Sequence, residues 1–142
     1  MIIPDVNLLL YAYMTPYPQH AAARAWWENA LSGGHHVGLT SVAVFGFLRL
    51  STSRRVYTTP MTADEASLAV ESWSASPQAC FLSAGPRHLE IALRLVRAVG
   101  TAGNLTTDIQ LAAHAIENQA EIHSNDADFA RFPGLRWSNP LR

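Results

Sequence analysis

Several residue types are scarce in this chain, and each scarcity excludes a class of structure. Among its 142 residues are one cysteine and no lysine; all ten basic residues are arginine, and the formal net charge is −1. The single Cys80 can form neither an internal disulfide nor a cysteine zinc cluster, and its apolar neighbours predict a small buried side chain. A net charge near zero provides no broad basic face for nucleic acid, although local RNA contacts remain compatible with it.

Long hydrophobic segments are also missing. No apolar run approaches the length of a membrane span, and no signal peptide precedes the first apolar segment. We therefore expect a cytoplasmic protein. A chain of 142 residues is long enough to bury a substantial core without disulfides, so we expect one domain over residues 1–142.

Short apolar segments alternate with segments of helical periodicity along the chain. The pattern predicts strands over residues 2–5, 36–39, 78–82, 121–124 and 135–137. It predicts helices over residues 19–31, 40–49, 62–73, 86–99 and 107–116, with capping boxes beginning at Thr62 and Thr107. This succession is typical of an α/β fold with a mainly parallel sheet and right-handed crossover connections.

Asp5 is the acidic residue that ordinary packing explains least well. It ends the first strand between apolar segments, where an unpaired carboxylate is costly to bury. In open α/β sheets, ligands bind beyond the carboxyl ends of strands where the strand order reverses. If the first and fourth strands are neighbours, Asp5 meets Asp126 there, and Asp108 can enter from the helix that leads to the fourth strand. Taken singly, Asp108 also suits a first helical turn, and Asp126 and Asp128 also suit a turn.

Three neighbouring carboxylates repel one another and raise one another's pKa unless a cation neutralises them. Oxygen ligands of this kind suit Mg²⁺ or Mn²⁺. The spacing therefore indicates a metal site formed by Asp5, Asp108 and Asp126.

Four segments carry a family resemblance, in this order: MIIPDVNLLLYA, GFLRLSTSRRVY, TTDIQLAAHAIE and EIHSNDADFARFPGLRW. Together they resemble the PIN-domain ribonucleases, and most of all the VapC toxins of toxin–antitoxin modules. The resemblance implies an α/β fold with a central parallel sheet of order 3-2-1-4-5 flanked by helices. It also implies Mg²⁺-dependent cleavage of RNA phosphodiester bonds, with water as the nucleophile. The partners that it implies are an RNA substrate, a VapB-like antitoxin, a second copy in a homodimer, and DNA only through the antitoxin.

Carried over residue by residue, the resemblance makes Asp5, Asp108 and Asp126 the catalytic, metal-binding acids. Asn7 and Asp128 would orient these acids, and Arg49 would meet a carboxylate or a phosphate. One position departs from the family pattern, because many members carry a glutamate three residues before that arginine, where this chain has Gly46. The departure leaves open whether one metal ion binds or two.

Other interpretations compete with a nuclease. A haloacid-dehalogenase-like phosphatase needs a second aspartate at the position of Asn7 and a lysine elsewhere, and this chain has neither. A catalytically weakened PIN module that acts mainly as a protein-binding partner stays compatible with Gly46. The pair Trp26 and Trp27 suits either core packing or a groove for an antitoxin helix. We expect His114 and His123 at the surface or behind the acidic residues.

Overall fold

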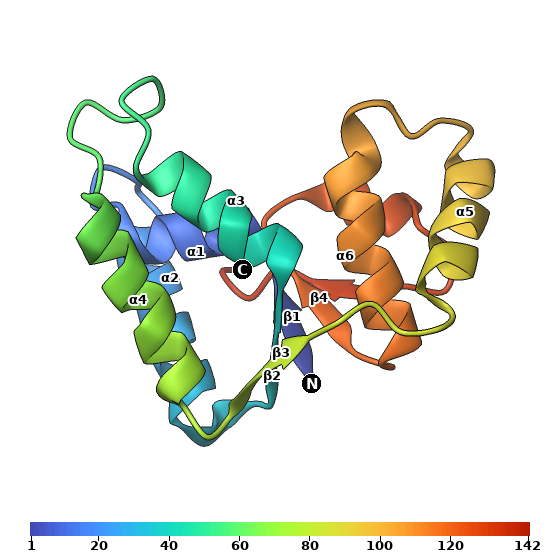
Figure 1. Ribbon diagram of the computed structural model, residues 1–142, viewed down its shortest axis with the longest axis horizontal. Coiled ribbons are helices and arrows are strands. Elements are labelled where there is room, and N and C mark those ends of the chain that lie inside the picture. Colours follow the sequence, from blue (N-terminus) through green and yellow to red (C-terminus); the bar gives the residue numbers. More distant parts are fainter.

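A five-stranded parallel sheet forms the centre of the structure, a computed structural model that describes residues 1–142 (Figure 1). Its strand order is β3-β2-β1-β4-β5, and every neighbouring pair is parallel. The strands are β1 (Ile2–Pro4), β2 (Val37–Thr40), β3 (Ala79–Leu82), β4 (Glu121–His123) and β5 (Arg136–Ser138). The α/β fold class and the strand order 3-2-1-4-5 are confirmed.

Six helices connect and flank the strands: α1 (Val6–Tyr13), α2 (His20–Asn29), α3 (Ser41–Ser51), α4 (Ala63–Ala75), α5 (His88–Val99) and α6 (Thr106–Glu117). Figure 1 shows α1 to α4 gathered on one side of the sheet edge and α5 and α6 on the other. None of these helices combines the length and the apolar character needed to cross a membrane.

Local capping residues explain where several helices begin and end. The Thr40 hydroxyl accepts a hydrogen bond from the Ala43 backbone at the start of α3, and Thr62 and Glu65 form the predicted capping box of α4. Gly100 ends α5 in the left-handed conformation, with φ of +83°. The second predicted capping box is wrong: α6 begins at Thr106, one residue earlier than expected, and no side chain caps it.

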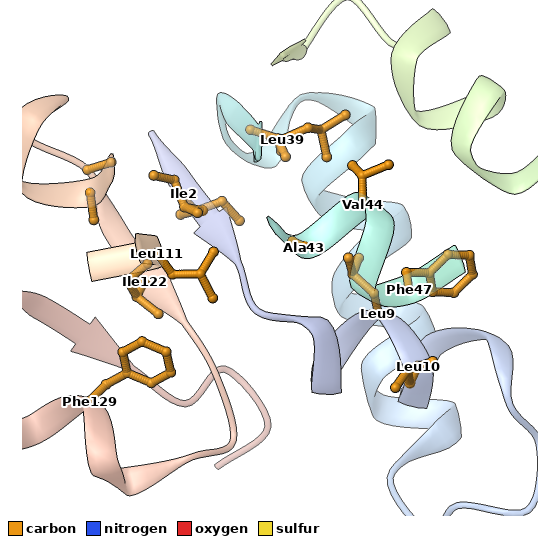
Figure 2. Close-up of a cluster of buried hydrophobic side chains, with 14 of the residues drawn as sticks. Ile2, Leu9, Leu10, Leu39, Ala43, Val44, Phe47, Leu111, Ile122 and Phe129 are labelled. Carbon is orange, nitrogen blue, oxygen red and sulfur yellow. The ribbon is translucent and has the colours of Figure 1, made fainter. Parts of the chain in front are cut away.

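Helix α1 was not predicted, because the apolar run Leu8–Leu10 has no polar face from which a helical period can be recognised. All three of these leucines are buried. Figure 2 shows how the core continues on both sides of β1: Ile2 lies between one group from α6, β4 and the C-terminal segment and another from α1 and α3. The labelled members of the first group are Leu111, Ile122 and Phe129. Those of the second group are Leu9, Leu10, Ala43, Val44 and Phe47.

The edge position of β3 explains one error of the sequence analysis. Cys80, expected to be buried, is exposed, and its neighbour Phe81 is exposed as well. A strand paired on one side only leaves side chains uncovered that would be buried in a central strand.

The two neighbouring tryptophans of α2 have different environments. Trp27 is buried in the core, whereas half-buried Trp26 donates its Nε1 hydrogen to Nδ1 of His123 at 3.0 Å.

The register of β1 and β4 decides which residues meet beyond the sheet. Pro4 is paired with His123, and the Asp5 backbone N–H donates to the His123 carbonyl at 2.9 Å. The residues that follow the two strands, Asp5 and Ser124, are therefore neighbours. This is the carboxyl edge of the sheet, where the sequence analysis expected a ligand.

His114 is buried between α5 and α6, and its expected place at the surface or near the acids is wrong. Its ring lies 4.3 Å from the ring of His88, measured between centroids, and the Nδ1 atoms of both rings are buried without a hydrogen-bond partner. Burial, and next the neighbouring His88, lower the pKa of His114, while the charge of Glu117 opposes this shift. The folded protein therefore holds His114 neutral.

We expect this buried histidine to make the stability of the fold depend on pH. The unfolded chain keeps an ordinary pKa of 6.5 for His114, so below that pH it binds more protons than the folded chain. The stability that neutral His114 contributes is present above pH 6.5 and is lost as the pH falls towards the lower folded pKa. Melting temperatures between pH 7.5 and 5.5 should therefore fall more steeply for the wild type than for His114→Gln. Parallel pH profiles for the two proteins would contradict this account.

Candidate functional site

Asp5 is held in one orientation by two short hydrogen bonds. Its Oδ1 accepts from the Val6 backbone N–H at 2.7 Å, which caps the start of α1, and its Oδ2 accepts from the Ser124 hydroxyl at 2.7 Å. The residue is buried, and this burial raises its pKa; the two hydrogen bonds lower it, and the charge of Asp126 raises it. The two hydrogen bonds thus offset only part of the free-energy cost of burying the charged Asp5 side chain.

Ser124 connects the residues of the site, and the sequence analysis did not identify it. Besides donating to Asp5, its hydroxyl oxygen accepts hydrogen bonds from Asn7 Nδ2 at 3.3 Å and from the Asp126 backbone N–H at 2.9 Å. Ser124 is itself fully buried. The only signal in the sequence is a hydroxyl residue at the end of a strand just before an acidic turn, which is too common a pattern to indicate a role.

Asp108 lies in the first turn of α6, and the other acids affect its pKa. Burial is the largest cause that raises its pKa, followed by the charges of Asp5, Asp126 and Asp128, and together they bring it to about 7. The charges of Asp5, near the start of the chain, and of Asp126 and Asp128, in the turn after β4, therefore all act on Asp108. Their mutual repulsion is what the sequence analysis expected of a metal site.

Asp126 and Asp128 belong to the turn after β4. The Oδ1 atom of Asp126 caps a short 3₁₀ segment (Ala127–Arg131) by accepting from the Asp128 backbone N–H at 2.9 Å. Buried Phe129 anchors this turn in the core, while Asp128 stays exposed. Asp126 therefore serves as a turn residue and also adds its charge to the acidic cluster.

The chemistry of these side chains fits a hard cation. All the donors are oxygens, and the Oδ1 atom of Asn7 is buried next to them without a hydrogen-bond partner. A buried acceptor without a partner is uncommon, and a cation or its hydration shell would satisfy it. In the conformation of this structure, no three acidic, histidine or cysteine side chains lie close enough together to hold a metal ion.

A hollow of about 320 Å³ opens beside the first carboxylate. Its walls come from α1, α3 and the start of α6, and it is lined by Asp5, Val6, Val42, Phe45, Gly46, Arg49, Leu50 and Thr107. Arg49 is exposed at this hollow and forms no ion pair, since the salt bridges of the structure involve Arg24, Arg87 and His123.

Gly46 lies at a close approach between α3 and α1. A Cβ atom built at this position would come within 2.7 Å of the Cγ2 atom of Val6. Valine is stiff about its χ1 angle, so it has little freedom to move away. Packing against Val6 therefore gives a physical reason for glycine in the interior of α3, and position 46 shares the hollow with Asp5.

Comparison with known proteins agrees with the fold and with the sequence segments. The PIN domain model matches residues 2–135. Ribonuclease VapC33 of Mycobacterium tuberculosis is 55% identical over 142 residues, which cover 100% of this chain and 99% of that protein. Ribonuclease VapC37 of the same organism is 40% identical over 140 residues, covering 99% and 97% of the two chains.

Solved structures of low sequence identity share the same fold. The structure of VapBC2 from Rickettsia felis bound to a promoter DNA fragment superposes with a TM-score of 0.71 at 17% identity, over 98% of each chain. FitAcB from Neisseria gonorrhoeae gives a TM-score of 0.68 at 17% identity, over 100% of this chain and 99% of that one. The PIN domain model match over residues 2–135 and the 55% identity to Ribonuclease VapC33 show that the chain belongs to the PIN-domain family. Within this family it is a VapC-type protein, as the four sequence segments predicted.

The burial of Asp108, together with repulsion from the neighbouring acids, predicts a gain in stability when its charge is removed. In the unfolded chain its pKa is 3.8, whereas in the folded protein it is about 7, so the stability it contributes is present below pH 3.8 and is lost as the pH rises towards 7. In EDTA at pH 8, Asp108→Asn should therefore unfold at higher urea concentration than the wild type, by about 1 kcal/mol after allowance for its partial exposure.

At pH 4 this advantage should largely disappear, because Asp108 of the wild type is then protonated. Asp64→Asn is the matched control, since Asp64 is exposed in the first turn of α4 and does not contribute to the raised pKa of Asp5 or Asp108. An equal gain for the two variants, or a gain for Asp108→Asn that does not change with pH, would show that the acidic cluster is not its cause.

Proposed function

We propose that this protein is an endoribonuclease that acts as the toxin of a toxin–antitoxin module. The observation that carries the proposal is the electrostatic coupling of Asp108 to Asp5, Asp126 and Asp128 at the carboxyl edge of the sheet. Concentrated carboxylates destabilise a fold, so their presence there is best explained by a function. The names of the relatives, Ribonuclease VapC33 and Ribonuclease VapC37, support RNA as the substrate.

Asp5, Asp108 and Asp126 would hold Mg²⁺, or alternatively Mn²⁺, in this site. When bound, such an ion supplies positive charge that neutralises the carboxylates, lowers the pKa of a coordinated water and stabilises charge on the phosphoryl oxygens. The oxygen-only donor set and the free Oδ1 of Asn7 support this assignment. The site thereby offers the chemistry that hydrolysis of a phosphodiester bond requires.

The remaining residues of the site would orient these acids and the substrate. The Ser124 hydroxyl fixes the rotamer of Asp5 and is itself held by the Asn7 amide. Asp128 adds negative charge at the mouth of the site. Arg49, unpaired at the neighbouring hollow, has a planar fork of donors that suits two oxygens of a phosphate.

The acidic site also suggests which molecules this protein binds. A VapB-like antitoxin that inserts a basic side chain among the acids would relieve their repulsion and block the site. Support comes from structural neighbours, which include VapBC-1 from Haemophilus influenzae and the DNA-bound VapBC proteins of Rickettsia felis and Salmonella typhimurium. We propose that DNA is reached only through the antitoxin. The exposed Leu89 and Leu93, one turn apart on α5, support a homodimer.

A second candidate is a catalytically weakened PIN module that acts mainly by binding proteins. It is favoured by the lack of a carboxylate at position 46 and by acids that do not converge on one point in this structure. The two candidates differ in whether purified protein cleaves RNA and in whether cleavage depends on the acids.

Removal of one acid should separate these candidates. Asp5→Asn keeps the size of the side chain and removes its charge, so cleavage of RNA in the presence of Mg²⁺ should fall on the order of a hundredfold or more. Sequencing of RNA 5′ ends after expression measures this and identifies the cleavage site. Asp64→Asn, which alters an exposed acid on α4, should cleave like the wild type. If wild type and Asp5→Asn leave the same 5′ ends at equal frequency, the nuclease proposal fails.

Gly46 provides a test of the metal site without RNA. In a Val6→Ala background, which removes the methyl groups that a Cβ atom would strike, Gly46→Glu adds a carboxylate at the hollow beside Asp5. Without metal, the added charge should lower the melting temperature through repulsion. Saturating Mg²⁺ should then raise it by more than in Val6→Ala alone, because ligand binding stabilises the folded state.

Gly46→Gln in the same Val6→Ala background is the control, because glutamine has nearly the same shape and no charge. Its response to Mg²⁺ should match that of Val6→Ala alone. Equal responses of the Glu and Gln variants would mean that position 46 does not contribute to metal binding.

A further inference from the structure

Phe45 is an exposed aromatic side chain beside the acidic site, and neither the sequence analysis nor the metal site accounts for it. Its side chain is 64% exposed although its neighbours Val44 and Phe47 on α3 are buried in the core. It lines the hollow that also contains Asp5 and Arg49. Exposure of a single aromatic side chain is common in itself, but this one lines a hollow together with a buried carboxylate and an unpaired arginine, and that combination suits a ligand.

The residues one turn before and one turn after Phe45 on α3 are polar, whereas Val42, three positions before it, is apolar and half-buried. Ser41 and Arg49, one turn before and one turn after it, are both exposed and lie on the same face of the helix. Phe45 is therefore the one aromatic group of the hollow, with half-buried Val42 and Leu50 beside it. A flat ring next to a cation and a carboxylate suits a nucleotide, which joins a flat base to an anion.

The shape of the hollow agrees with this choice. Gly46 contributes no side chain to it, and Val6 provides an apolar floor. Its volume of about 320 Å³ is at the lower end of the range for small-molecule sites. A single unpaired base can enter such a space, whereas a base within a duplex cannot, because its faces are covered by stacked neighbours.

We propose that Phe45 is the stacking platform for an unpaired RNA base next to the phosphodiester bond that is cut. Arg49 binds the phosphate of the same nucleotide, and Asp5 lines the same hollow. The inference rests on the proposed nuclease function and adds to it the kind of RNA recognised: a single-stranded or looped segment with at least one base turned outward. Thr107, which also lines the hollow, offers its hydroxyl group to the ribose or to the base edge.

RNA affinity of variants at position 45 tests the stacking. The probe is a fluorescein-labelled single-stranded RNA of mixed sequence, bound to protein that carries Asp5→Asn so that the RNA is not cut. Phe45→Ala should weaken binding by about ten- to a hundredfold, since stacking on an aromatic side chain contributes strongly to single-strand binding. Phe45→Trp should retain the affinity, and Phe45→Leu, which is apolar but has no π face, should not.

Phe81 supplies the matched control, because it is 55% exposed on β3 and does not line the hollow. Phe81→Ala should bind RNA like its parent. A base stacked on indole quenches its fluorescence, so RNA should quench Phe45→Trp more than the parent protein, and Phe81→Trp should show no such excess.

The outcomes separate this inference from the proposed function. Full affinity in Phe45→Ala or Phe45→Leu overturns the stacking role, and so does a parent protein that binds no single-stranded RNA. A loss of self-association in Phe45→Ala with unchanged RNA affinity overturns it as well, because the ring then contacts a second copy. In each of these cases, acid-dependent cleavage by the wild type, measured separately, decides whether the nuclease proposal stands.

Discussion

A buried carboxylate at the end of β1, with two half-buried acids near it, costs free energy that the surrounding elements only partly offset. Parallel pairing of β1 with β4 places Asp5 beside the turn that carries Asp126, and the first turn of α6 adds Asp108. The fold offsets part of the cost with the Val6 backbone N–H and the Ser124 hydroxyl, yet the pKa values of Asp5 and Asp108 remain raised. A site of this kind gains stability when a cation enters, which couples ligand binding to the stability of the sheet edge.

The two sides of the site have different chemistry. The acids come from β1, α6 and the turn after β4, whereas α3 presents an unpaired arginine and an exposed aromatic ring at the adjoining hollow. This division suits a nucleic-acid substrate, whose phosphate needs positive charge and whose base needs a flat apolar surface. Close packing of α3 against α1 at Gly46 and Val6 brings the two sides together. The glycine that departs from the family pattern therefore has a role in packing whatever its effect on metal binding.

The fold could be predicted from the sequence to the extent that local patterns decide it. Alternating strand and helix signals, the Thr62 capping box and Gly100 all predicted elements that the structure contains. The predictions failed where burial depends on neighbours distant in sequence. Helix α1 has no exposed face because α2 and α3 pack against it. Cys80 is exposed because β3 is an edge strand, and His114 is buried because α5 packs over it. The spacing of apolar residues within one segment does not predict which side chains a distant segment will cover.

The family and the candidate acids can be identified from residue types in a fixed order. Asp5 was conspicuous because a carboxylate between apolar segments is costly to bury. How these residues act on one another depends on the packing of the folded chain. The links from Ser124 to Asp5, Asn7 and Asp126, the coupling of Asp108 to three other acids, and the hollow shared by Phe45 and Arg49 join segments far apart in the chain. Such contacts arise from strand order and helix packing, and electrostatic and stacking energies depend on the distances that packing sets.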